Sequence, residues 1–179
     1  INDAEPGLVA AIDSSDPNRQ SIIWTVPGKP VCKIGETTFT SLQDAVDSVS
    51  TRTDQVTIEM LVSSYAIESS IDFYYGQNIN ITTADSVGAT CEFDRGLDNA
   101  PLFNVNTKVN LSLDNITING LAEIYENNNS PLIAIDNTNA VVSIGTGSQD
   151  SSVYIGNAKT LGDGSVVYVE SCKLNIGTP

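Results

Sequence analysis

Three acidic residues, Glu92, Asp94 and Asp98, are the side chains of this sequence best suited to hold a metal ion. Glu92 and Asp94 are separated by one residue, so in a strand both would point to the same face. If Asp98 or the more distant Asp72 lay nearby, the combined oxygens could coordinate a hard cation such as calcium. The alternative is an ordinary one, because outward carboxylates that alternate with apolar residues are typical of any solvent-exposed sheet face.

An asparagine-rich segment provides a second candidate site. Tyr125 and Glu126 are followed by Asn127, Asn128 and Asn129. Amide groups can exchange hydrogen bonds with sugar hydroxyls, and a tyrosine ring can pack against a sugar. We therefore consider Tyr125, Asn127, Asn128 and Asn129 as contacts for a glycan. Polar insertions in loops commonly bind nothing, and that interpretation stays open.

Other kinds of catalytic or metal chemistry have little support. Histidine is absent, which removes the most common acid–base catalyst near neutral pH. Cys32, Cys91 and Cys172 lie too far apart for the usual zinc-binding spacing. We predict that these cysteines are small apolar side chains of the core, and their odd number excludes complete pairing within one chain. The residues therefore predict no catalytic centre and no cofactor.

The composition predicts a folded domain that avoids polyanions. The chain has 179 residues, of which 40% are hydrophobic and 17% charged, unlike a disordered segment. Its length suits one domain. There are 22 acidic and 8 basic residues, for a net charge of −14, so nucleic acid is an unfavourable partner. No apolar run has the length of a membrane span, and we expect no membrane insertion.

The strongest pattern in the sequence is a repeat of about 31 residues. Pairs of apolar residues recur in two registers: Ile79/Ile81, Leu111/Leu113, Val142/Ile144 and Leu174/Ile176, and Ile71/Phe73, Phe103/Val105, Ile133/Ile135 and Val167/Val169. A third face carries Ile116/Ile118 and Val153/Ile155. The period of two within each pair is that of a strand. We predict an all-β, right-handed parallel β-helix (β-solenoid) with three short strands per coil. The side chains expected to point inward in stacked rows are Phe103, Val105, Leu111, Leu113, Ile133, Ile135, Val142, Ile144, Val167 and Val169.

One helix is expected near the start of this domain. Ser41 to Ser50 has apolar residues at helical spacing, and Thr40 or Ser41 can cap it. Cys32 to Thr40 resembles a hairpin that leads into the helix. We assign residues 1–30 to a leader or linker and residues 31–179 to the β-helix domain with its N-terminal cap. Within the leader, Ser21 to Val26 is β-prone and is expected to cover an end of the core.

The end of the sequence predicts an open edge. Leu174 and Ile176 belong to an unfinished coil, so strand edges and an apolar cross-section would face solvent. We expect the native chain to continue and the domain to be truncated here. As it stands, the sequence predicts end-to-end self-association through this end.

The run KIGETTFTSLQDAVDSV, followed by TIEML, resembles the N-terminal cap of right-handed parallel β-helix domains of the pectate-lyase-like superfamily. The runs NINITTA, VNLSLDNITING, AVVSIGTG and KLNIGTP resemble coils of adhesin-like surface proteins of bacteria and archaea with that fold. The resemblance covers roughly residues 31–179. It implies a secreted or cell-surface protein with a host or environmental glycan or protein as partner.

The resemblance leaves two functions open. The first is a non-catalytic, adhesin-like module that serves as a stalk or binding scaffold. The second is the N-terminal fragment of a polysaccharide-degrading lyase or glycoside hydrolase. Lyases of the superfamily pair calcium-binding carboxylates with a basic residue, and the nearest match is Arg95 beside Glu92, Asp94 and Asp98. The histidine and Arg-x-Lys pair of polygalacturonase-like hydrolases are absent.

Overall fold

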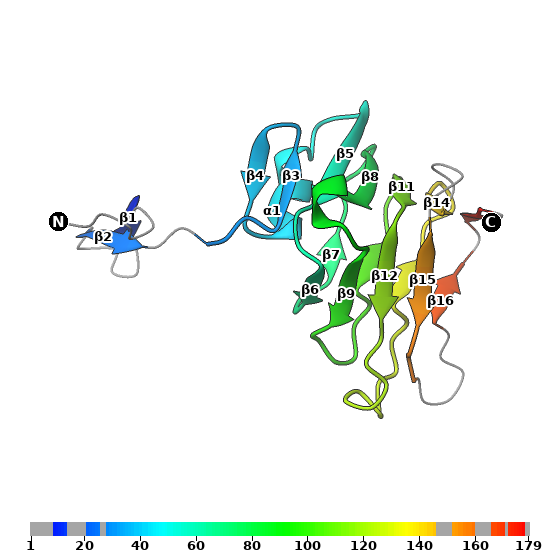
Figure 1. The fold of residues 1–179 in the computed structure, drawn as a ribbon. Coiled ribbons are helices and arrows are strands. Elements are labelled where there is room, and N and C mark those ends of the chain that lie inside the picture. The colour runs from blue at the N-terminus through cyan, green and yellow to red at the C-terminus, as the bar shows by residue number, and fades with distance from the viewer. Residues whose placement is uncertain are drawn as a thin grey trace.

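The structure is a computed structural model that describes residues 9–13, 21–25, 28–145, 152–159, 166–170 and 172–177. These residues form mostly β-sheet, with one α-helix and a single turn of 3-10 helix, η1 (Asp85–Val87). Figure 1 shows the strands following one another from the α-helix toward the C-terminus. Within the described part of the chain, no helix has the length and apolar character needed to cross a membrane.

A short hairpin and the helix open the domain, as the sequence predicts. Strands β3 (Cys32–Ile34) and β4 (Thr37–Phe39) pair antiparallel, and Gly35 between them has a φ of +57°, a value that favours glycine. Helix α1 (Leu42–Ser48) begins after Ser41, whose hydroxyl accepts a hydrogen bond from the backbone N–H of Asp44 at 3.0 Å. The predicted N-cap is therefore confirmed.

The remaining strands form three sheets, and the chain adds one strand to each sheet in turn. The first sheet contains β5 (Gln55–Met60), β8 (Asn78–Thr83), β11 (Asn110–Leu113), β14 (Val141–Ile144) and β17 (Lys173–Ile176), with β3 and β4 added beside β5. The second sheet contains β6 (Ser64–Ile67), β9 (Cys91–Arg95), β12 (Ile116–Asn119) and β15 (Val153–Gly156). The third sheet contains β7 (Ile71–Asp72), β10 (Phe103–Val105), β13 (Ile133–Ile135) and β16 (Val167–Val169). From β5 to β17 every pairing is parallel.

The register of these pairings matches the repeat read from the sequence. Ile79 pairs with Leu111, Leu111 with Val142, and Val142 with Leu174. The other two sheets keep the same order, with Phe103 opposite Ile133 and Ile116 opposite Val153 in the neighbouring strands. Residues about one repeat apart are therefore neighbours in space, and the parallel pairing predicted from the two registers is confirmed.

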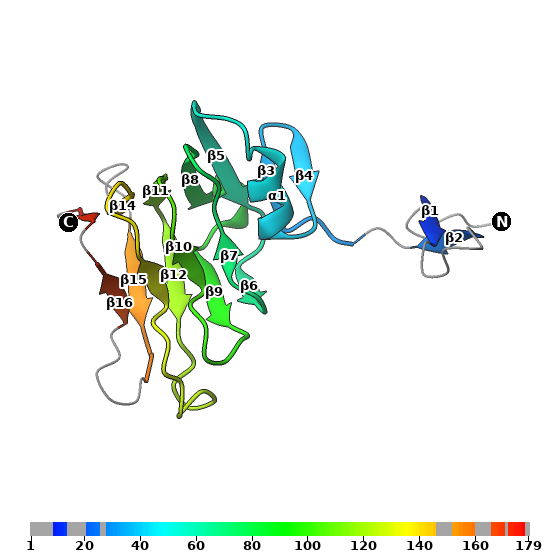
Figure 2. The same ribbon diagram turned by 180° about the vertical axis from the view of Figure 1, so that it is seen from behind.

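The apolar pairs form one continuous core. Those of β8 to β14 are buried, and Leu42, Ala45 and Val46 of α1 join the same cluster. Helix α1 contacts β3, β4 and β7, so it covers the N-terminal end of the core (Figure 2). Strand β16 departs from the expectation of a fully inward row, since Val167 is only half-buried and Val169 is exposed. The physical reason is that β16 is the outermost strand of its sheet.

An antiparallel hairpin precedes this domain. Strand β2 (Ser21–Thr25) falls on the β-prone run, and it pairs with β1 (Val9–Asp13), which the sequence analysis did not predict. In both views the hairpin lies apart from the three sheets (Figures 1 and 2). The expectation that this segment covers an end of the core is therefore wrong as far as residues 21–25 are concerned, and Val26 lies outside the described residues.

Candidate functional site

Glu92 and Asp94 lie together on the outer face of β9, as the period of two predicts. Asn119, opposite Asp94 in β12, donates from its amide nitrogen to both carboxylates, at 2.5 Å to Glu92 Oε1 and 3.1 Å to Asp94 Oδ1. On the other side, the hydroxyl of Ser64 in β6 donates to Asp94 Oδ2 at 3.1 Å. Asp94 thus accepts hydrogen bonds from neutral donors on both neighbouring strands, and Glu92 accepts one from β12.

The same row of polar side chains continues to the next turn. Asn157, which follows β15, donates from its side-chain amide to Asn119 Oδ1 at 2.8 Å. The backbone N–H of Leu121 donates to the same oxygen at 3.1 Å. We name Ser64, Glu92, Asp94, Asn119 and Asn157 the polar ladder. It crosses four turns on the outside of the second sheet, where its carboxylates can accept hydrogen bonds from a hydroxyl- or amine-bearing ligand.

The other candidate metal ligands do not join this pair. Asp98 lies in the loop after β9, where its Oδ1 accepts a hydrogen bond from the backbone N–H of Asn99 at 3.0 Å. Asp72 belongs to β7 in the third sheet and accepts a hydrogen bond from the amide of Asn104 at 2.7 Å. Among the described residues, no group of three or more histidine, cysteine or acidic side chains is placed to hold a metal ion. The hypothetical convergence on a calcium ion is therefore not found in this part of the chain.

Arg95 faces the interior rather than the carboxylates. Its side chain is 2% exposed, and its guanidinium donates to four backbone carbonyls: Leu97 at 3.2 Å, Ala100 at 2.9 Å, Ser130 at 3.2 Å and Pro131 at 2.9 Å. Burial lowers the pKa of the Arg95 guanidinium. The role of a base beside Glu92 and Asp94 is therefore wrong for Arg95. The signal was present in the sequence, because the alternation that turns these carboxylates outward turns residue 95 inward.

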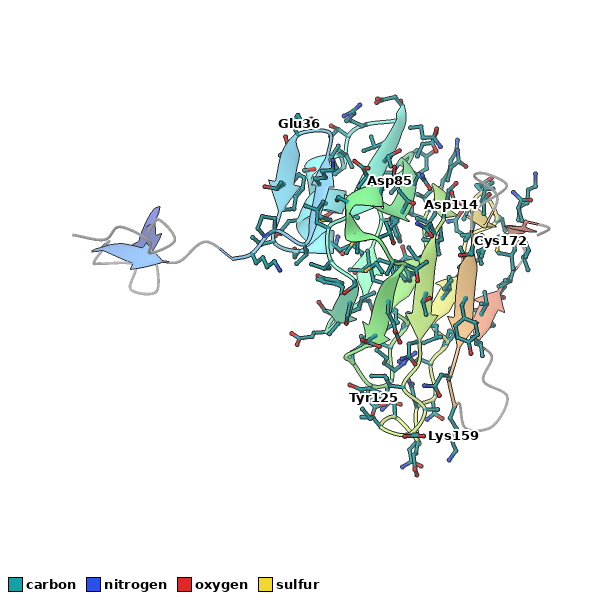
Figure 3. The ribbon with its side chains drawn as sticks, viewed as in Figure 1. Glu36, Asp85, Asp114, Tyr125, Lys159 and Cys172 are labelled. Carbon is teal, nitrogen blue, oxygen red and sulfur yellow. The ribbon has the colours of Figure 1, made fainter. Side chains whose placement is uncertain are left out.

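The asparagine-rich loop lies beside the loop that holds Asp98. The backbone N–H of Asn129 donates to Asn99 Oδ1 at 3.4 Å, and Arg95 joins the ends of both loops. Two candidate regions that are separate in the sequence are thus neighbours on successive turns. Figure 3 shows Tyr125 in the part of the loop that projects past the strands.

The four candidate residues of this loop differ in their availability to a ligand. Asn127 and Asn129 are exposed and Tyr125 is half-buried, so each can be reached from solvent. Asn128 is buried, and its Oδ1 accepts a hydrogen bond from the backbone N–H of Ser130 at 2.8 Å. Its side chain therefore stabilises the loop, while Tyr125, Asn127 and Asn129 form the accessible surface.

Two shallow depressions that the sequence did not indicate flank η1. One has a volume of about 350 Å³, and the other about 510 Å³. The first is lined by Ala84, Asp85, Gly88, Ala89, Thr90 and Asn115. The second is lined by Lys29, Leu61, Val62, Ser63, Ser64, Ser86 and Val87. Ser64 is the one residue that the depressions share with the polar ladder.

The cysteines agree with the prediction of apolar core residues in two cases of three. Cys32 and Cys91 are buried, and burial raises the pKa of each thiol to about 12, which keeps both neutral and unreactive at physiological pH. Cys172 is only half-buried, and its thiol donates to the carbonyl of Ile135 at 3.6 Å. All three are free thiols.

Comparisons of the chain with protein-family models, curated proteins and solved structures gave no match.

Proposed function

We propose that residues 31–179 form a right-handed parallel β-helix of the kind found in the pectate-lyase-like superfamily. Support comes from the rotation of the chain through three parallel sheets, with residues about one repeat apart in register. The right-handed sense follows from the strong preference of parallel crossover connections for that hand. In this proposal α1 is the N-terminal cap, and each rotation through the sheets is one coil.

We infer that this domain is a non-catalytic, extracellular adhesin-like module that serves as a stalk or binding scaffold at the cell surface. One observation carries the inference that the domain is non-catalytic. The outward carboxylates of Glu92 and Asp94 accept hydrogen bonds from neutral side chains, and the nearby cation, Arg95, donates its hydrogen bonds to four backbone carbonyls inside the fold. A rigid core with polar outer faces suits the presentation of a surface to a glycan or a protein. The accessible residues of the asparagine-rich loop are the proposed contacts.

The experiment is a binding measurement that also follows the fate of the ligand. The purified chain is tested against immobilised neutral and acidic oligosaccharides, and bound sugar is recovered and weighed by mass spectrometry. Saturable binding with intact sugar is expected, and Tyr125→Ala is expected to weaken it. Tyr154→Ala is the matched control, since Tyr154 is an exposed tyrosine on β15 and does not belong to the asparagine-rich loop. Shortened sugar would favour the polysaccharide-degrading alternative, and binding by Tyr125→Ala equal to that of Tyr154→Ala would exclude Tyr125 as a contact.

A further inference from the structure

The polar ladder contains the dipeptide of this sequence that is most prone to lose a side-chain amide. Asn119 is the only asparagine of the chain that is followed by glycine. In such a dipeptide the backbone nitrogen of the glycine can attack the side-chain carbonyl carbon of the asparagine, because glycine has no side chain that hinders the approach and leaves the backbone free to rotate. Asparagine is accordingly counted among the thermolabile residues. Asn119 is therefore a candidate site of spontaneous deamidation.

The fold requires the glycine at this position. Gly120 directly follows β12 and is buried, and its backbone N–H donates to the carbonyl of Gly156 in the next turn at 2.9 Å. A Cβ atom at residue 120 would lie 2.6 Å from the Cα atom of Ala158 and 2.8 Å from the carbonyl oxygen of Asn157. Both are backbone atoms in a close-packed contact, so neither can move aside as a flexible side chain would. The close approach of the two turns explains why a vulnerable dipeptide occurs here.

The native structure holds both reacting groups in other hydrogen bonds. The side-chain oxygen of Asn119 accepts from the backbone N–H of Leu121 at 3.1 Å and from the amide of Asn157 at 2.8 Å. Its side-chain nitrogen donates to the two carboxylates of the ladder. The attacking nitrogen belongs to the hydrogen bond that joins Gly120 to the next turn. Attack therefore requires this part of the ladder to open locally.

Deamidation would place a third carboxylate in the ladder. Oxygens of Glu92 and Asp94 lie 2.5 and 3.1 Å from the Asn119 nitrogen that a negatively charged oxygen would replace. Both carboxylates would lose a donor and gain a like charge, which is unfavourable. Arg95, the neighbouring cation in the sequence, donates to carbonyls inside the fold. Conversion of the amide should therefore loosen the ladder irreversibly.

We propose that Asn119 is a deamidation site that the polar ladder protects, and that its conversion to an acid loosens the contact between β12 and the segment after β15. In the first step a bond forms between the backbone nitrogen of Gly120 and Cγ of Asn119. The bond between Cγ and the amide nitrogen breaks, and ammonia leaves with the proton of the backbone nitrogen. Water, the only co-reactant, then opens the cyclic imide to aspartate or isoaspartate. This inference does not depend on the proposed scaffold role.

Incubation of the full chain at mildly alkaline pH, in buffer and in urea that unfolds it, tests the proposal. Mass spectrometry of peptides that contain Asn119 detects the replacement of the amide by an acid. The reaction is expected to be at least about 50-fold slower in buffer than in urea, because local opening breaks several hydrogen bonds. Asn157→Ala removes a donor to Asn119 and is expected to speed the reaction about 2- to 10-fold in buffer only. Ser64→Ala is the matched control, since Ser64 donates to Asp94 in the same ladder, and it should react like the wild type.

A direct replacement tests the consequence of the reaction. Asn119→Asp reproduces one product, and hydrogen exchange of this variant is compared with that of the wild type. The backbone N–H groups of Gly120 and Ala122, which donate to Gly156 and Asn157, are expected to exchange at least about 10-fold faster in the variant. Circular dichroism of each variant establishes that the sheets are retained.

The other outcomes would overturn the proposal. An Asn119 that keeps its amide in urea is not a deamidation site. Equal rates in buffer and in urea would show that the fold does not protect it, and equal rates for Asn157→Ala and Ser64→Ala in buffer would show that the ladder is not the protecting element. Unchanged hydrogen exchange in Asn119→Asp would rule out the loosening of the two turns.

Discussion

Replacement of Arg95 by methionine tests whether a buried cation can hold two neighbouring turns together. The guanidinium joins the loop after β9, through Leu97 and Ala100, to the segment before β13, through Ser130 and Pro131. Methionine fills a similar volume but donates no hydrogen bond. The substitution therefore leaves four carbonyls without this partner and keeps most of the packing.

The magnitude follows from two opposing terms. A fully buried carbonyl that loses its partner costs about 1–3 kcal/mol; these four belong to half-buried residues, so the lower part of that range applies and together they cost roughly 4–8 kcal/mol. Removal of the buried charge returns several kcal/mol of desolvation free energy. We expect Arg95→Met to lower the free energy of unfolding by about 3 kcal/mol net. With a urea m-value of about 2 kcal/mol/M, the midpoint would fall by about 1.5 M.

Urea unfolding followed by circular dichroism measures this difference, and hydrogen exchange locates it. Protection of backbone amides in residues 96–101 and 128–132 should fall more than in the sheets. Arg52→Met is the control, because Arg52 is an exposed arginine paired with Asp54, and its loss should cost less than about 0.5 kcal/mol. A loss below about 1 kcal/mol for Arg95→Met would show that desolvation cancels the hydrogen bonds, and would refute the reasoning.

Three further predictions follow from the core and the candidate site. Phe103→Ala should lower the free energy of unfolding by about 3–5 kcal/mol in urea, since Phe103 is buried against Phe93 at 5.7 Å between ring centroids; a change near zero would contradict its place in the core. Burial raises the pKa of Cys32 and Cys91 from 9.0 to about 12, so the native state retains protons that the unfolded state releases, and stability should fall as pH rises from 9 toward 12 in urea titrations. Stability that does not change over this range would argue against deeply buried thiols. Incubation with pectic and other acidic glycans, with and without calcium, should produce no new reducing ends and no unsaturated products; turnover that is lost in Asp94→Asn would instead support the enzyme alternative.

The strand pairing could be predicted because the repeat is carried by side chains that must be buried. Leu111 and Val142 are both apolar because both are buried in the same row of the core. They are partners in neighbouring strands, so the spacing between them in the sequence predicts the register of the sheet. The N-cap of α1 could also be predicted, because Ser41 precedes apolar residues at helical spacing. Sequence periodicity is informative wherever burial selects the residue type.

The candidate site was harder to predict because it depends on contacts between turns of unequal length. Asn119 reaches Glu92 and Asp94 only through the pairing of β12 with β9. The approach of Asn129 to Asn99 depends on how two loops fold, and no periodic pattern marks it. Arg95 was considered as a base because it follows Asp94 directly in the sequence, but the alternation of a strand turns these two neighbouring side chains to opposite faces.

The covered end of this domain comes first in the chain, and that order has a consequence for synthesis. α1 and the β3–β4 hairpin leave the ribosome before any of the strands from β5 onward. At roughly 5–20 residues per second, a repeat of about 31 residues takes a few seconds to emerge, so each parallel strand has seconds in which to pair, although such pairing is slower than hairpin formation. Each new strand therefore finds its template already formed, and folding can advance with translation. A lesion in β8 should leave the nascent chain without a template for every later turn, whereas a lesion in β16 should spare all the turns made before it.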